Sequence, residues 1–380
     1  MEKKSKKLTM EDLGYGPFFE SNRAKLGLDG FAVARVTTET KGAYSVKNTD
    51  GTYLAKITGK IRHNARSKED YPAVGDWVAI EESGEGQAVI RAILPRRTVM
   101  KRKFGDRDRS GEKNEIQMIA ANIDTAYVVQ SVGRDYNLNR FERYFAIARD
   151  GGIEPAVILN KIDLISKEEL NSKLLEIKTR LGDVSVFATS TKTGEGLAAL
   201  KDNIIKGKTY CFLGSSGVGK SSLINILLGE GTIKTGDVSE YSDRGKHVTT
   251  RREMYFLPAR RSLGAGGDSG GIVIDNPGVR EVGLGDTLSS VDSIFDEIAT
   301  LSNDCKFDDC THTHEPGCAV LAAAKSGTLD AGKFQNYITL QKEARHNESS
   351  KLEKRNKARQ FGKFVNRVKK DLRGVGFKDF

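Results

Sequence analysis

Residues 209–228 read TYCFLGSSGVGKSSLINILL, and this stretch decides the fold of the domain around it. The part from Gly214 to Ser221 fits the phosphate-loop pattern G-x-x-x-x-G-K-S. An apolar run typical of a strand precedes it and a helical run follows it, as the pattern requires. In such a loop, backbone N–H groups and the helix N-terminus surround the phosphates of a nucleotide. The sequence therefore predicts a nucleotide-binding α/β domain.

The residues of this loop have separate predicted roles. We expect Lys220 to reach the β- and γ-phosphates and the Ser221 hydroxyl to ligate Mg²⁺. The other residues expected to contact the nucleotide are Gly214, Ser215, Ser216, Gly217, Val218, Gly219 and Ser222.

A second phosphate motif follows the apolar run 272–274. Residues 275–278, DNPG, have the D-x-x-G form that P-loop GTPases place at the end of a strand. We expect Asp275 to approach Mg²⁺ through a water molecule and the Gly278 N–H to contact the γ-phosphate.

A polar loop, residues 245–251 (GKHVTTR), lies between the two phosphate motifs. Its position predicts a switch threonine whose hydroxyl and carbonyl close over Mg²⁺. We favour Thr250 for this role, and Thr249 is the alternative.

The identity of the base is predicted by residues 160–163, NKID, which fit N-K-x-D and follow the apolar run 155–159. The Asp163 carboxylate can accept hydrogen bonds from guanine N1–H and the 2-amino group together, and adenine lacks this pair of donors. We expect Asn160 to brace the loop and the stem of Lys161 to lie against the purine. The nucleotide should therefore be GTP or GDP.

The order of the motifs is unusual. Residues 189–192, TSTK, follow the next strand. GTPases have at this point a backbone N–H that binds guanine O6, and Ser190 and Thr191 are the candidate residues. These guanine motifs precede the phosphate loop, whereas an ordinary GTPase has them last. Circular permutation explains this order, because the termini of a compact α/β domain can be rejoined without changing its core. Nucleotide state could then be transmitted from the D-x-x-G motif, which now ends the domain, to the C-terminal module.

The strand and helix patterns predict a multidomain chain. Residues 117–290 alternate apolar strands with amphipathic helices, which indicates a circularly permuted P-loop GTPase domain with a largely parallel sheet. Residues 28–97 carry short alternating runs that predict an OB-like β-barrel, a fold that often binds RNA, and a barrel without a ligand is the alternative. The rest is predicted as an N-terminal extension (1–27), a basic linker (98–116) and a helical domain with a basic tail (291–380).

The composition indicates which classes of partner the chain can bind. The net charge of +10 favours a polyanion such as nucleic acid, and the basic residues concentrate at 96–109 and 342–378. No apolar run approaches the ~20 residues of a membrane-spanning helix, and the N-terminus lacks the apolar core of a secretory signal. We therefore expect a cytoplasmic protein that has no membrane partner. The expected oligomeric state is a monomer.

Three of the four cysteines lie close together in CKFDDCTHTHEPGC, residues 305–318. Cys305, Cys310, His312 and Cys318 form C-x₄-C-x-H-x₅-C, a closed tetrahedral donor set for one structural zinc ion. His314 is an alternative ligand, and reduced cysteines without a metal are the other interpretation. Cys211, in the strand before the phosphate loop, is expected in the core.

The combination of N-K-x-D, GSSGVGKSSLIN, GKHVTT, IDNPG and the cysteine motif, after a β-barrel, resembles the ribosome small subunit dependent GTPase A family. This resemblance covers residues 28–340. It implies an OB-fold domain, a permuted GTPase domain and a zinc-containing helical domain. It also implies GTP hydrolysis stimulated by the 30S ribosomal subunit with its 16S rRNA, and a role in late maturation of that subunit. Asn276 and Val248 depart from the usual threonines of the family, so modest changes in hydrolysis are expected.

Hydrolysis requires a residue that positions the attacking water. Ras-like enzymes carry a glutamine directly after D-x-x-G, whereas this chain has Val279, whose side chain can neither donate nor accept a hydrogen bond. His247 in the polar loop is the candidate, because a neutral imidazole can accept a hydrogen bond from water near pH 7. The alternative is that His247 contacts rRNA or phosphate.

Overall fold

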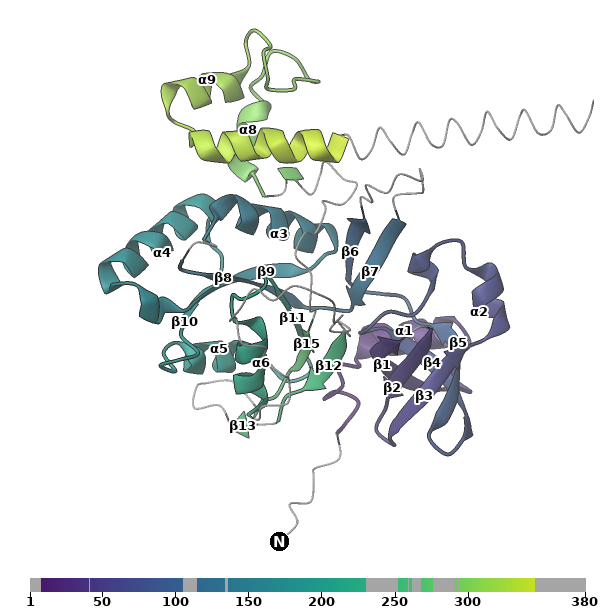
Figure 1. Ribbon diagram of the computed structural model, residues 1–380. Helices are drawn as coiled ribbons and strands as arrows, with labels where there is room; N and C mark the ends of the chain where they lie inside the picture. The colour runs from purple at the N-terminus through teal and green to yellow at the C-terminus, as the bar shows by residue number, and fades with distance from the viewer. Residues whose placement is uncertain are drawn as a thin grey trace, which may run out of the picture. The chain divides into compact units, whose positions relative to one another are not determined.

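The computed structural model describes residues 8–40, 42–104, 115–133, 136–229, 252–258, 260–261, 268–275, 291–292 and 294–345. The chain divides into two compact units, Met1–Gly283 and Leu284–Phe380 (Figure 1). The first unit contains the predicted barrel and the predicted nucleotide-binding domain, and the second contains the cysteine motif. Within the described residues, no helix is long and apolar enough to span a membrane.

The barrel is built from five strands: β1 (Ala32–Thr40), β2 (Ala43–Lys47), β3 (Thr52–Ile57), β4 (Trp77–Gly84) and β5 (Gln87–Ile93). It closes because β1 pairs with both β2 and β4, while β5 joins β3 to β4. The short helix α2 (Gly59–Asn64) and the turn η1 (Lys68–Asp70) connect β3 to β4. Alternate residues of these strands point inward and form an apolar core that includes Val36, Val46 and Ile80. The predicted OB-like barrel is confirmed.

The nucleotide-binding part is an α/β sheet with its phosphate loop in the middle. Along the chain the elements are β8 (Thr125–Ser131), α3 (Leu138–Asp150), β9 (Glu154–Asn160), η2 (Ile162–Leu164), α4 (Lys167–Leu181), β10 (Val186–Thr189), α5 (Leu197–Asn203), β11 (Thr209–Leu213), α6 (Lys220–Leu228), β12 (Glu253–Phe256), β13 (Arg260–Arg261), β14 (Asp268–Ser269) and β15 (Ile272–Asp275). The order β10-β9-β8-β11-β15 is parallel, and β12 is added antiparallel to β15. The predicted, largely parallel α/β fold is confirmed.

Local sequence signals explain several of these elements. The strands β9 and β11 are almost continuously buried, as strands with helices on both faces of a parallel sheet must be. Helix α4 begins with a capping box, in which the Ser166 hydroxyl accepts from the Glu169 N–H and the Glu169 carboxylate accepts from the Ser166 N–H. The glycine that follows α4, Gly182, has a positive φ and ends the helix.

One sheet runs through both parts of the first unit. Strand β12 pairs with β15 on one side and, at Thr38 and Glu253, with the barrel strand β1 on the other. The result is an eleven-stranded sheet in the order β10-β9-β8-β11-β15-β12-β1-β2-β3-β5-β4. The strand that lies beside the D-x-x-G aspartate is therefore also the neighbour of the barrel.

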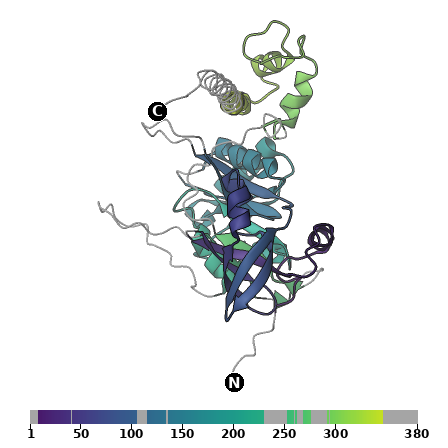
Figure 2. The same ribbon diagram turned by 90° about the vertical axis from the view of Figure 1, so that its right-hand side faces the viewer.

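The structure differs from expectation on both sides of the barrel. The stretch predicted as a basic linker contains β6 (Val99–Phe104), which pairs with β7 (Glu115–Ala121), a strand that begins in this stretch and ends beyond it. The N-terminal stretch carries helix α1 (Pro17–Lys25), the dark purple helix beside the barrel in Figure 2. Leu13 and Phe19 are buried with Trp77 in an apolar cluster separate from the barrel core, so this segment covers the outer face of β1 and β4. Neither the strand β6 nor the helix α1 was predicted from the sequence, because charged residues interrupt the apolar pattern in both stretches.

Arg35 joins the barrel to its surroundings although it is fully buried. Its guanidinium donates to the carbonyl oxygens of Leu13 (2.6 Å), Gly75 (3.3 Å) and Asn122 (3.1 Å) and to the Thr209 hydroxyl (2.8 Å). Burial lowers the pKa of Arg35 to about 9, which still leaves the group charged at neutral pH. One side chain thus connects the N-terminal segment, the barrel and the strand that leads into the phosphate loop.

Replacing Arg35 with Met is expected to lower the free energy of unfolding by about 3 kcal/mol or more, because three buried acceptors lose their donor and the Gly75 carbonyl keeps only its hydrogen bond from the Asn122 amide. Trp77 is the only tryptophan, is buried and lies 5.7 Å from the guanidinium, so its fluorescence in urea reports the change. Arg91→Met is the matched control, because Arg91 makes an exposed ion pair with Glu81 and should cost at most about 1 kcal/mol. Equal effects of the two substitutions would refute the role of Arg35.

The second unit is helical. Helices α8 (Asp296–Ser302) and α9 (Ala319–Ser326) flank the cysteine motif, and a further helix covers 331–345. Phe295 and Ile298 are fully buried, and Phe295 packs edge-on against Tyr337 of the helix over 331–345. The cysteine loop therefore lies between helices that share a small apolar core.

Candidate functional site

The phosphate loop leaves the end of β11 and enters α6, and its glycines are required by close contacts. A Cβ on Gly214, which has φ +140°, would lie 2.2 Å from the Val129 carbonyl oxygen of the neighbouring strand. A Cβ on Gly219, which has φ +101°, would lie 2.3 Å from the Asn160 amide nitrogen. Val218 is fully buried and holds the loop to the core. The backbone path thus depends on residues that lack a side chain at these points.

Lys220 lies inside this loop at the N-terminus of α6. Its ammonium group donates to the carbonyl oxygens of Gly214 (2.8 Å) and Ser215 (2.7 Å). Ser221 and Ser222 follow in the first turn of α6 and are half-buried. The ammonium group and the helix N-terminus therefore both contribute positive potential at the loop, which suits phosphate oxygens.

Asp275 ends β15, the strand next to β11. The pairing of Cys211 with Ile274 sets these two parallel strands in register, so Asp275 comes to the same sheet edge as the loop. Burial raises the pKa of Asp275, the nearby Lys220 charge lowers it, and Glu253 raises it further. A buried carboxylate close to a lysine at this edge fits the predicted role near Mg²⁺. Mg²⁺ binds oxygen ligands, and a carboxylate and a serine hydroxyl supply them here.

The N-K-x-D residues lie where β9 ends, and Asn160 connects three loops. Its amide nitrogen donates to the Val218 carbonyl of the phosphate loop at 2.8 Å, and its amide oxygen accepts from the Thr189 hydroxyl at 3.1 Å. Asn160 and Thr189 are fully buried. Lys161 adopts the left-handed conformation, φ 63°, which turns the chain toward Asp163. The phosphate and guanine loops are thereby fixed relative to each other.

Asp163 and the T-S-T-K run are joined by one short hydrogen bond. The Ser190 hydroxyl donates to the Asp163 carboxylate at 2.6 Å and accepts from the N–H groups of Lys192 and Thr193. The Ser190 N–H donates to the Glu195 carbonyl, whereas the Thr191 N–H has no hydrogen-bond acceptor among the described residues. Of the two predicted residues, Thr191 therefore offers the N–H that can bind guanine O6.

Sequence reasoning missed Arg140. It lies in the first turn of α3, and its guanidinium donates to the Ser215 hydroxyl of the phosphate loop at 2.9 Å. The turn that leads into α3 is held by Gln130, whose side-chain amide donates to the Asn137 carbonyl and accepts from its N–H. Since a charged residue near a helix start resembles an ordinary surface residue, no sequence signal separated Arg140 from its neighbours.

We expect Arg140→Ala to raise the Kd for GTP about fivefold, because a half-exposed charged hydrogen bond to the loop is worth about 1 kcal/mol. Ser215→Ala should have a similar effect, and the double variant should be no weaker than either single one. The measurement is titration of a fluorescent GTP analogue. Additive effects in the double-mutant cycle would show that the contact does not position the loop.

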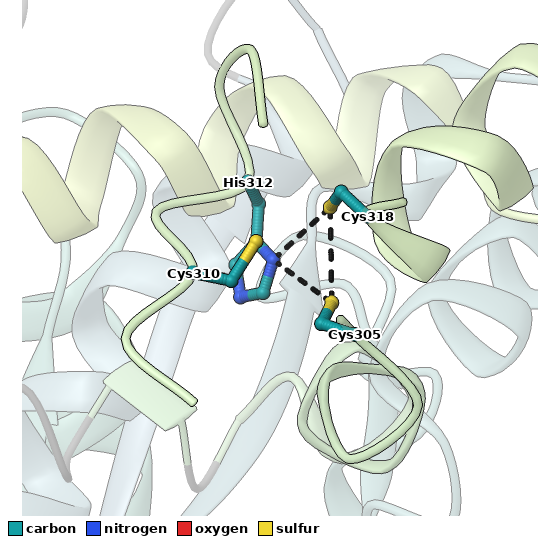
Figure 3. Close-up of side chains that lie close together, drawn as sticks. All are labelled: Cys305, Cys310, His312 and Cys318. Carbon is teal, nitrogen blue, oxygen red and sulfur yellow. Dashed lines mark hydrogen bonds between the residues drawn. The ribbon is translucent and has the colours of Figure 1, made fainter. Parts of the chain in front are cut away.

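The cysteine motif forms a compact cluster in the second unit (Figure 3). The ligand atoms of Cys305, Cys310, His312 and Cys318 lie within 4.8 Å of one another. The Cys305 and Cys318 sulfurs are 3.8 Å apart, and the His312 Nδ1 lies 3.6 Å and 3.4 Å from them. Bonds of about 2.3 Å to sulfur and 2.0 Å to nitrogen in a tetrahedron require separations of about 3.8 Å and 3.5 Å. The donor set therefore fits zinc.

His312, and not His314, is the histidine of this cluster. His312 is buried and adopts the left-handed conformation, φ 57°, which turns its ring toward the sulfurs. His314 is exposed, and its Nδ1 lies 2.8 Å from the Thr313 hydroxyl. The alternative ligand considered from the sequence is thus not brought to the cluster.

Several predicted residues lie outside the described residues. They are His247, Thr249 and Thr250 of the polar loop and Gly278 of the D-x-x-G motif. The second half of the basic region 96–109 and most of the C-terminal basic stretch lie outside them as well. Their predicted roles stay predictions.

Known proteins resemble this chain over most of its length. Residues 93–285 match the RsgA GTPase family. "Small ribosomal subunit biogenesis GTPase RsgA 2" of Vibrio vulnificus is 36% identical, over 97% of this chain and 97% of that protein. "Small ribosomal subunit biogenesis GTPase RsgA" of Opitutus terrae is 40% identical, over 88% and 90%.

Two solved structures share the fold. YjeQ from Thermotoga maritima superimposes with a TM-score of 0.59 and 24% identity, covering 82% of this chain and 98% of that one. YloQ, described as a circularly permuted GTPase, has a TM-score of 0.55 and 22% identity, covering 83% and 96%. The permuted arrangement predicted from the motif order is confirmed.

Proposed function

Because the chain belongs to the RsgA GTPase family, we propose that it binds the small (30S) ribosomal subunit through 16S rRNA and assists late maturation of that subunit. Family membership makes the chain a GTP hydrolase, as the motifs predict. In the proposed cycle the GTP-bound form binds the subunit, the subunit stimulates hydrolysis to GDP and phosphate, and the GDP-bound form leaves.

The observation that carries this proposal is the shared sheet of the first unit. Strand β12 pairs with the barrel strand β1 on one side and with β15, which ends at Asp275, on the other. RNA bound to the barrel would therefore lie close to the GTP site. The basic charge of the chain supports an RNA partner. The names of the relatives, which are small-subunit biogenesis GTPases, support the ribosomal subunit as the source of that RNA.

The proposed chemistry assigns roles to five residues. Lys220 binds the β- and γ-phosphates, while Ser221 and Thr250 hold Mg²⁺, which Asp275 approaches through water. His247 positions the attacking water. Bound Mg²⁺ neutralises charge that develops on the phosphates. The guanine is held by Asp163 and its neighbours, as described above.

The second unit is proposed to hold one structural zinc ion on Cys305, Cys310, His312 and Cys318. Four protein ligands leave no open position, so this metal would support folding and not catalysis. The protein is proposed to act as a monomer in the cytoplasm, where the subunit is assembled.

Sedimentation with purified subunits tests the proposal. The full chain should travel with 30S subunits in the presence of a non-hydrolysable GTP analogue and should be largely released with GDP. The control uses 50S subunits, which also consist largely of RNA and should retain much less protein. Equal retention by both subunits, or retention that does not depend on the nucleotide, would overturn the proposed function.

A further inference from the structure

A polar groove of about 630 Å³ lies beside the barrel and belongs to no site described so far. One wall comes from the end of β1 and the start of β2, with Glu39 and Tyr44, and the other from the segment 65–72. Arg252, directly before β12, completes the lining. The volume lies within the range of small-molecule sites, about 300–1,000 Å³.

The charge of the groove selects an anion. Arg66, Lys68 and Arg252 line it against one carboxylate, that of Glu39. Arg252 is half-buried and donates to the Met118 carbonyl at 3.1 Å. Burial lowers the pKa of Arg252, and the negative charge of Glu39, the one carboxylate in the lining, raises it in part. Three cations against one carboxylate leave a net positive charge, and a half-buried cation favours a negatively charged ligand because the ligand replaces hydration that burial removed.

The wall formed by 65–72 is held rigidly in place. Arg96 donates to the carbonyl oxygens of Glu69 (2.7 Å) and Tyr71 (2.8 Å) and pairs with the buried Asp76 at 2.7 Å. The Asp70 carboxylate also accepts hydrogen bonds from the backbone N–H groups that open this turn. Such a wall needs little reordering when a ligand binds, which favours affinity.

Tyr71 gives the groove an aromatic surface. Tyr71 is half-buried, Tyr44 is buried, and both line the groove. Aromatic rings beside cations are the arrangement by which proteins bind single-stranded nucleic acid, with bases on the rings and phosphates on the cations. An acidic peptide would use the cations and leave the ring without a partner.

We propose that this groove binds one phosphate-linked nucleotide of single-stranded RNA, with its phosphate on Arg252 and its base on Tyr71. The proposal rests on the proposed function for the choice of RNA as partner. The site is separate from the GTP site, because it is lined by the barrel, the segment 65–72, Met118 and Arg252.

The test measures binding of a fluorescent hexamer of uridine to the full chain by anisotropy, without ribosomes. Tyr71→Ala and Arg252→Met are each expected to weaken binding about tenfold, since one stacked base or one desolvated phosphate contact is lost. Arg91→Met removes the same charge from the barrel surface outside the groove and should change binding less than twofold. GTP-analogue binding serves as the folding control and should be unchanged in all three variants.

Three results would overturn the proposal. One is unaltered RNA affinity in the Tyr71 and Arg252 variants. Another is an equal loss in Arg91→Met, which would indicate diffuse charge attraction. The third is binding of polyglutamate as tight as that of the RNA, which would indicate an acidic peptide site. Because no ribosomal subunit is present, a failure here is distinguishable from a failure of 30S binding.

Discussion

Replacing Asp163 with Asn is expected to weaken GTP binding about 30-fold or more, equivalent to ~2 kcal/mol. The carboxylate is the predicted acceptor for two guanine donors, and an amide can accept only one of them and presents an N–H₂ group to the other. The Ser190 hydroxyl, which donates to Asp163 at 2.6 Å, holds the carboxylate in place. Titration with a fluorescent GTP analogue measures the loss.

Two controls make this result specific. Ser190→Ala removes only the supporting hydroxyl and should weaken binding by less than about tenfold. Xanthosine triphosphate carries a carbonyl where guanine has its 2-amino group, so it should bind Asp163→Asn better than GTP does. Equal affinity of the unmodified protein for ATP and GTP would contradict guanine recognition by Asp163.

Removing the metal is expected to unfold the second unit while GTP binding stays intact. In a small zinc domain the metal site exists only in the folded state, so zinc binding stabilises that state. The free energy of this binding is about 10–16 kcal/mol. Chelation or Cys310→Ala should therefore abolish the helical signal of α8, α9 and the helix over 331–345. Circular dichroism, limited proteolysis and elemental analysis of the same samples measure helix loss and zinc content together.

His312→Ala and His314→Ala form a matched pair for this prediction. Both remove an imidazole from the same loop, but only His312 lies in the cluster. The first variant should lose zinc and unfold the module, and the second should keep one zinc ion per chain. A folded module without metal, or loss of zinc in His314→Ala, would contradict the assignment.

Much of the fold could be predicted from patterns in short stretches of the sequence. The phosphate loop, the N-K-x-D motif and the cysteine motif each depend on residues within a few positions of one another, so their spacing carries the geometry. The barrel strands and the α/β strands also follow from short apolar runs. The permutation followed from motif order alone.

The remaining features depend on pairings between distant residues. Nothing near Thr38 or Glu253 indicates that β1 and β12 lie side by side. Arg35 has the sequence context of an outward-facing strand residue, yet its partners come from positions between 13 and 209. The strand β6 is rich in lysine and arginine, and nothing in this charged pattern indicates that it pairs with β7.

Single-turnover hydrolysis of GTP, with and without purified 30S subunits, tests the central claim most directly. The subunit is expected to accelerate hydrolysis about tenfold or more, because a bound partner can order groups around the attacking water. Subunits of the 50S type should leave the rate unchanged. If 30S subunits bind the protein yet do not change the rate of hydrolysis, the chain is an RNA-binding scaffold and not a GTPase driven by the subunit.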